Sequence, residues 1–152
     1  KDITPLLAQP EAMRQTVRAL AEPFQDAGIE FVAGVESRGF IFGTLLADRL
    51  NAGFVPVRKP GKLPFKKIAK TYELEYGTNT IEVHTDAVPV GAKVLMCDDL
   101  LATGGTMAAA CELIGELGAE IEGIAFVIEL DFLAGRDKLA DYRLHTLLHV
   151  TD

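Results

Sequence analysis

The sequence predicts an α/β fold, with a mostly parallel central sheet flanked by helices. Short apolar runs that are typical of buried strands alternate with longer stretches whose apolar residues recur at helical spacing. Turns rich in glycine or proline separate many of these segments. Because strand–helix–strand repeats connect parallel neighbours, this order favours a parallel sheet with helices on both faces. We expect one domain over residues 1–152, a length that allows a substantial core.

Each expected element has a local signal. Residues 10–27 carry apolar residues at helical spacing up to Gly28, which favours a helix end. Pro56 favours an edge position for its strand, and residues 58–70, rich in Pro, Gly and Lys, are predicted to form a long loop. The other expected elements are strands over 29–35, 54–57, 93–97, 124–130 and 144–150, helices over 39–50 and 106–117, and a hairpin of strands 71–76 and 80–84 with a turn at 77–79.

Composition and charge argue against several classes of protein. The net charge is −7 and no stretch gathers Lys and Arg as a duplex-binding surface would, so no nucleic acid is expected as a partner. Cys97 and Cys111 lie in apolar segments without disulfide or zinc spacing, which favours reduced thiols and the cytoplasm. No apolar run approaches the roughly 20 residues that cross a bilayer, and no signal-peptide pattern is present, so no membrane association is expected.

The segment after the predicted strand 93–97 has the features of a phosphate-binding loop. A strand, a glycine-rich loop and a helix start place backbone N–H groups at the positive end of a helix dipole. Glycines there allow positive φ and close approach of a ligand, and threonine hydroxyls can add donors. The loop residues are Ala102, Thr103, Gly104, Gly105 and Thr106. The alternative interpretation is a capped strand–helix turn without a ligand. The pattern lacks the lysine of GxxxxGK[ST] and is not GxGxxG.

Two acidic residues precede this loop. Asp98 and Asp99 lie too close to a bound phosphate to be its ligands. We expect them to accept hydrogen bonds from ribose hydroxyls or to hold Mg²⁺ through water. Two solvated carboxylates are the alternative.

A second anion site is predicted where two other strands end. Glu36, Ser37 and Arg38 follow the strand 29–35, and the guanidinium of Arg38 can bond phosphate oxygens in pairs. Arg58 and Lys59 follow the strand 54–57. The alternatives are a surface ion pair between Arg38 and Glu36 and a solvated basic loop. Lys62 and the lysines of 66–69 are expected to form a mobile cover that excludes water from the site.

The string from Val94 to Thr106 resembles the phosphoribosyl-pyrophosphate signature of the type I phosphoribosyltransferases. The stretch from Tyr72 to Gly77 matches the YxLEYG pattern of the adenine phosphoribosyltransferases, and the resemblance runs from Lys1 to Arg136. It implies the type I phosphoribosyltransferase fold, with a flexible loop or hairpin and a small N-terminal hood. That hood is expected to be truncated, since the sequence begins at Lys1 without Met.

The resemblance implies a function in purine salvage. Adenine and 5-phosphoribosyl 1-pyrophosphate would form AMP and pyrophosphate, with Mg²⁺ held mainly through the substrate and no dedicated protein site. A homodimer is also implied. The residue roles that it implies are 5-phosphate binding by 102–106, ribose binding by Asp98 and Asp99, and pyrophosphate binding by Glu36, Ser37, Arg38, Arg58, Lys59 and Lys62, with a cis peptide bond between Glu36 and Ser37.

The same resemblance assigns the proton transfer and the base pocket. Glu75 is the implied general acid or base and Tyr76 helps to close the loop. Glu73 lies two residues away on the same predicted strand face, so spacing does not separate the two carboxyls. Lys1 and Leu130 are implied in the base pocket, although a core leucine is the alternative for Leu130. Asp131 resembles a position near the base.

Two other functions are compatible with parts of the pattern. A regulator could retain the phosphoribosyl-pyrophosphate site as a sensor and bind nucleic acid, but it would require a basic face or an extension. A transferase for a 6-oxopurine or for orotate is the other alternative, against which the YxLEYG match argues. The three histidines, His84, His145 and His149, are expected to be too scattered for a metal site.

Overall fold

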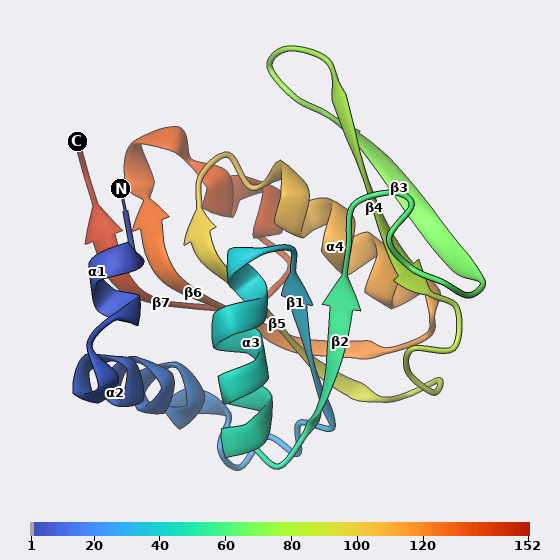
Figure 1. Cartoon of the computed structure of the whole chain (residues 1–152). Helices are drawn as coiled ribbons and strands as arrows, with labels where there is room; N and C mark the ends of the chain where they lie inside the picture. Colours follow the sequence, from blue (N-terminus) through green and yellow to red (C-terminus); the bar gives the residue numbers. More distant parts are fainter. Residues whose placement is uncertain (1) are drawn as a thin grey trace.

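A computed structural model describes residues 2–152, and the predicted base-pocket residue Lys1 lies outside them. Five parallel strands form one sheet in the order β2-β1-β5-β6-β7 (Figure 1). The predicted α/β fold with a mostly parallel sheet is therefore confirmed. Its strands are β1 (Phe31–Val35), β2 (Gly53–Val57), β5 (Lys93–Leu101), β6 (Glu120–Leu130) and β7 (Leu144–Val150).

Helices cover the sheet, and a two-stranded hairpin stands beside it. The helices are α1 (Thr4–Leu7), α2 (Pro10–Ala21), α3 (Arg38–Arg49) and α4 (Gly105–Glu116), with short 3-10 helices η1 (Glu22–Phe24), η2 (Asp131–Leu133) and η3 (Gly135–Leu139). The hairpin pairs β3 (Lys67–Glu73) with β4 (Thr78–His84) in antiparallel register. Across residues 2–152, every helix is too short or too polar to cross a bilayer.

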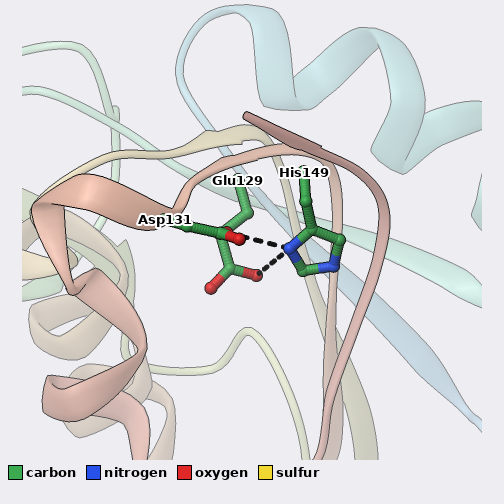
Figure 2. A group of neighbouring side chains, drawn as sticks. All are labelled: Glu129, Asp131 and His149. Carbon is green, nitrogen blue, oxygen red and sulfur yellow. Dashed lines mark hydrogen bonds and ion pairs between the residues drawn. The ribbon is translucent and has the colours of Figure 1, made fainter. Parts of the chain in front are cut away.

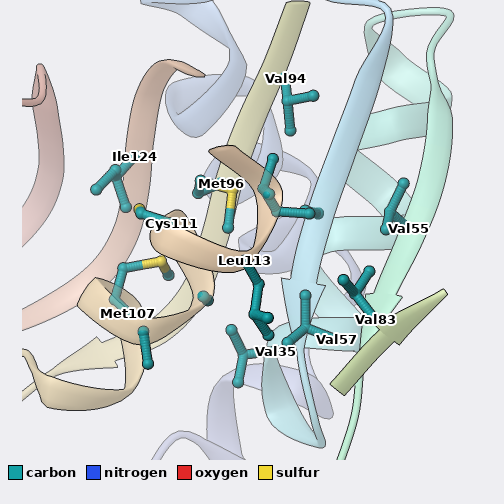
Figure 3. Close-up of a cluster of buried hydrophobic side chains, with 14 of the residues drawn as sticks. Val35, Val55, Val57, Val83, Val94, Met96, Met107, Cys111, Leu113 and Ile124 are labelled. Carbon is teal, nitrogen blue, oxygen red and sulfur yellow. The ribbon is translucent and has the colours of Figure 1, made fainter. Parts of the chain in front are cut away.

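Alternating side chains along the strands bury both faces of the sheet. In β5, Val94 and Met96 face one core and Leu95 and Cys97 face the other. The first core lies under α4 and includes Met107, among the buried side chains drawn in Figure 3. The second lies under α2 and α3. A parallel strand with helices over both faces of its sheet needs apolar side chains at successive positions, as β5 has.

Several predicted boundaries were wrong. The helix predicted over 10–27 ends at Ala21, because Pro23 has no N–H to donate to the carbonyl of Ala19. His145 Nε2 lies 2.9 Å from that carbonyl oxygen and replaces the missing donor. Strand β5 continues past 97 to Leu101, since parallel pairing with β6 extends that far.

The hairpin also differs from its prediction. Strand β3 begins at Lys67, inside the segment predicted as loop, because residues 67–73 pair continuously with 78–84. The turn therefore lies over 74–77, where the Leu74 N–H donates to the carbonyl of Gly77 at 2.9 Å. Figure 1 shows the hairpin tip projecting from the body of the molecule.

The close contact of Gly123 with Phe24 provides a test of the packing of this fold. A Cβ on Gly123 would lie 2.5 Å from the Phe24 ring, whereas a Cβ on Gly115 would meet nothing within 4 Å. We expect Gly123→Ala to lower the free energy of unfolding by about 1–3 kcal/mol, as overpacked cores do. The matched variant Gly115→Ala, in α4, should leave it equal or slightly higher. Urea unfolding of both variants checks this, and equal midpoints would contradict it.

Candidate functional site

Most of the predicted site residues lie where neighbouring parallel strands end. Glu36, Ser37 and Arg38 follow β1, Arg58 and Lys59 follow β2, and Asp98 to Thr106 span the end of β5 and the start of α4. Leu130 is the last residue of β6. In parallel sheets these carboxyl ends form the ligand-binding edge. The order β2-β1-β5-β6 therefore places the segments side by side.

The phosphate loop, which we define as residues 102–106, is shaped by close packing of backbone against backbone. Gly104 has a φ of +87° and immediately precedes α4. A Cβ at this position would collide with the carbonyl of Gly135, and one on Gly135 would collide with the carbonyl of Ala102. The loop lines a cavity of about 90 Å³ together with Asp98 and Phe126. Backbone N–H groups at a helix start in such a cavity suit an anion.

The two aspartates have different surroundings. Asp99 is buried, and its Oδ2 lies 2.7 Å from Nε of Arg38. Asp98 accepts a hydrogen bond of 2.8 Å from the N–H of Asp99. Burial, followed by the charge of Asp99, raises the pKa of the Asp98 carboxyl well above its usual range. The turn after β1 approaches closely, since a Cβ on Gly39 would lie 2.9 Å from Asp98 Oδ1.

Glu36 holds the cations of the neighbouring basic loop. Its buried carboxylate lies 3.0 Å from Nε of Arg58 and 2.6 Å from Nζ of Lys62. Burial would raise the pKa of the Glu36 carboxyl, but hydrogen bonds from Lys62, Arg58 and the Lys59 N–H together hold it below its usual range. Glu36 pairs with Arg58 and Lys62, and Arg38 pairs with Asp99. The alternative of an ion pair between Arg38 and Glu36 was therefore wrong.

Other features of this loop concern Ser37 and Glu82. The peptide bond between Glu36 and Ser37 is cis, and the side chain of Ser37 is exposed. Glu82, a buried residue of β4 that sequence reasoning missed, accepts a hydrogen bond of 2.9 Å from the N–H of Gly61. The basic loop, residues 58–62, is therefore tied to two carboxylates: that of Glu36 in the turn after β1 and that of Glu82 in β4.

The hairpin covers the start of α4 from the other side. The hydroxyls of Tyr72 and Thr106 lie 2.8 Å apart, and Lys70 pairs with Glu112 at 2.6 Å. A cavity of about 590 Å³ lies between the hairpin and α4. Its lining includes Glu73, Glu75, Thr103 and Gly105. The hairpin and the phosphate loop thus share one cleft.

The structure changes how the two candidate carboxyls compare. Glu73 ends β3 while Glu75 lies in the turn, so they do not share a strand face as predicted. Both line the cleft, and both are exposed. Tyr76 is 87% exposed at the hairpin tip. The geometry therefore does not distinguish Glu75 from Glu73 as the general acid or base, and only the YxLEYG motif favours Glu75.

Leu130 and its neighbours lie at the end of β6. Leu130 is half-buried and belongs to neither apolar core of residues 2–152, which argues against the core alternative. The next residue, Asp131, is exposed and lies 2.8 Å from Nδ1 of His149 (Figure 2). His149 converges with two carboxylates, Glu129 and Asp131, a grouping that the expectation about the spacing of the three histidines did not consider.

Sequence reasoning missed the pair of Glu129 and Arg136. Glu129 is buried, and both of its oxygens accept hydrogen bonds of 2.8 Å from the Arg136 guanidinium. The hydrogen bond from Arg136 is the largest influence on the pKa of the Glu129 carboxyl and lowers it against the effect of burial. A single carboxylate in the otherwise apolar run 124–130 was the available signal.

Comparisons with known proteins agree with this geometry. Residues 2–147 match the model of the phosphoribosyl transferase domain family. A relative from Koribacter versatilis, named adenine phosphoribosyltransferase, is 55% identical over 97% of this chain and 81% of its own length. The chain belongs to the adenine phosphoribosyltransferase family.

Solved structures of adenine phosphoribosyltransferases have the same fold. The enzyme from Rhodothermus marinus superposes with a TM-score of 0.95 at 54% identity, over 99% of this chain and 86% of that one. The enzyme from Saccharomyces cerevisiae, solved with adenine and an imino-altritol bisphosphate, superposes with a TM-score of 0.91 at 45% identity, over 97% and 85% of the two chains. The fold predicted from the resemblance is thereby confirmed.

Because the pKa of the Asp98 carboxyl is raised, we predict that replacing this carboxyl with a neutral amide stabilises the protein. A carboxyl whose pKa is higher folded than unfolded stabilises the fold most when protonated, and stability falls as pH rises from the unfolded to the folded pKa. Asp98→Asn, which keeps an acceptor for the Asp99 N–H, should raise Tm at pH 7.5 and have much less effect near pH 4. Exposed Asp26→Asn is the control. Thermal unfolding at the two pH values decides, and a lower Tm for Asp98→Asn at pH 7.5 would refute the prediction.

Proposed function

We propose that this chain transfers the 5-phosphoribosyl group of phosphoribosyl pyrophosphate to adenine, forming AMP and pyrophosphate in purine salvage. The observation that carries the proposal is the phosphate loop at the end of β5, facing a hairpin that carries the YxLEYG motif, in a chain of this family. The loop supplies an anion site at a helix start. The hairpin brings carboxyls to the same cleft.

The substrate phosphates would occupy two sites. We infer that the backbone of 102–106 binds the 5-phosphate, and that Asp98 and Asp99 receive the ribose hydroxyls. Arg38, Arg58, Lys59 and Lys62 would surround the pyrophosphate, with Ser37 beside it. Glu36 itself is an anion, so its part is to position Arg58 and Lys62 rather than to contact pyrophosphate.

The chemical step separates pyrophosphate from C1 of the ribose while a ring nitrogen of adenine bonds to that carbon. Positive charge develops on the sugar ring, and the carboxylates at the end of β5 stabilise it electrostatically. Glu75 would take up the proton that adenine loses, and the hairpin, with Tyr76 at its tip, would close over the cleft. Closure excludes water, which would otherwise hydrolyse the activated sugar.

Mg²⁺ is the proposed cofactor. Carboxylate oxygens are the ligands it prefers, and it commonly retains waters and binds substrate phosphates. One oxygen of Asp99 is already paired with Arg38, and Asp98 Oδ1 with a backbone N–H. This suits an ion held mainly through the substrate, with the aspartates acting through water. Bound there, it would neutralise charge on the leaving pyrophosphate.

Three further properties are proposals that rest on the resemblance and on composition. We infer that residues 1–152 act as one domain, that the chain works as a homodimer, and that it resides in the cytoplasm.

Lys1 and Leu130 are the proposed base-pocket residues. Leu130 has the half-buried position at a strand end that such a role requires.

A coupled assay of pyrophosphate release tests the function. The protein is offered phosphoribosyl pyrophosphate, Mg²⁺ and one base at a time: adenine, hypoxanthine, guanine or orotate. We expect turnover with adenine at least tenfold faster than with any other base. Omission of Mg²⁺ should abolish it. No turnover with adenine, or faster turnover with hypoxanthine or guanine, would refute the proposed substrate.

The choice between the two hairpin carboxyls can be tested directly. Glu75→Gln should lower kcat about 10²–10⁴-fold, the usual contribution of a positioned proton acceptor, and leave KM for phosphoribosyl pyrophosphate nearly unchanged. Glu73→Gln is the matched control, since Glu73 lines the same cleft and is also exposed. Steady-state kinetics of both variants measure this. A larger loss for Glu73→Gln would exchange their roles.

A further inference from the structure

A buried carboxylate at the end of β6 joins three elements. Glu129 has a side chain that is 4% exposed, and its two oxygens accept the paired hydrogen bonds from Arg136 in η3. The hydroxyl of Thr146 in β7 donates a third bond, 3.0 Å long, to Oε2. Nδ1 of His149, also in β7, lies 3.7 Å from Oε2 (Figure 2). Glu129 therefore connects β6, β7 and η3.

The converging Glu129, Asp131 and His149 have the side-chain types of a metal site, but the contacts favour another role. Both oxygens of Glu129 are engaged by the guanidinium of Arg136, so a cation would have to displace it. A paired guanidinium also neutralises the carboxylate that would attract the ion. The cluster is better described as an anchor for Arg136.

Arg136 follows directly after Gly135, the residue that packs against the phosphate loop. Its neighbour Gly135 is buried and packs closely against the loop. A Cβ on Gly135 would collide with the carbonyl of Ala102, and a Cβ on Gly104 would collide with the carbonyl of Gly135. Ala134, on the other side, has a φ of +52°, so the chain turns sharply there. A displacement of residues 134–136 would therefore move the backbone that shapes the anion site.

We propose that Glu129 is a positioning residue for the 5-phosphate site: by holding Arg136 it keeps Gly135 against the phosphate loop. Glu129 does not contact the phosphate in this arrangement. Its effect passes through the packed backbone of Gly135 to Gly104 and Ala102. The proposal rests on the proposed function for the identity of the bound group. Loss of the carboxylate charge should therefore weaken binding of a 5-phosphorylated ribose more than binding of adenine.

Glu129→Gln tests this, because glutamine keeps the size of the side chain but removes its charge. We expect the Kd for ribose 5-phosphate, measured by calorimetry, and the KM for phosphoribosyl pyrophosphate to rise about tenfold, the effect of weakening a hydrogen bond to a charged group. KM for adenine should change less than twofold. Glu11→Gln is the matched control, since it removes the same charge from an exposed pair with Arg14.

A second variant keeps the test decisive if Glu129→Gln does not fold. Arg136→Lys retains the positive charge but cannot form the two parallel bonds. It should raise the same Kd and KM about threefold, again without moving KM for adenine. An unchanged Kd for ribose 5-phosphate in folded Arg136→Lys or Glu129→Gln would overturn the proposal. Equal rises in KM for both substrates would also overturn it, because they indicate general loosening.

The binding measurement separates this proposal from the function on which it rests. If the wild-type chain binds ribose 5-phosphate but does not turn over adenine, the proposed function fails. The Kd values of the variants still decide the role of Glu129 in that case. If the wild-type chain does not bind ribose 5-phosphate, the positioning role is refuted with it.

Discussion

Contact of backbone against backbone between Gly104 and Gly135 is the constraint on which the site depends. It requires two glycines, one of them with positive φ, where η3 meets the residue that precedes α4. This contact holds the loop after β5, whereas Asp98 and Asp99 lie within β5 itself, which pairs with β6. A loop free to move would lose the preorganised N–H donors that make an anion site effective.

Buried carboxylates organise the charges around that loop. Asp99 pairs with Arg38, Glu36 pairs with Arg58 and Lys62, and Glu129 pairs with Arg136. In each case the acid is nearly inaccessible and the base reaches solvent. Burying an unpaired carboxylate would be costly, so each acid requires its cation in one place. An acidic protein thereby presents ordered cations on one edge of its sheet.

The hairpin is attached at its base and exposed at its tip. Ile81 and Val83 of β4 lie in the core, and Tyr72 reaches Thr106 at the start of α4. The turn over 74–77, which carries Glu75 and Tyr76, is exposed. This distribution keeps the base of the hairpin in contact with the start of α4. It also explains why the cleft between them includes residues of both elements.

The sequence alone determined the features that arise from local order. Apolar runs and helical spacing predicted the parallel sheet, and a strand followed by a glycine-rich helix start predicted the phosphate loop, because neighbouring residues produce both. Only the tertiary structure decided the charge pairs. Glu36 lies 22 and 26 positions from its partners Arg58 and Lys62, and no local pattern encodes such contacts. The same holds for Glu129, whose role depends on three elements meeting, and for the hairpin turn, whose place was set by pairing between β3 and β4.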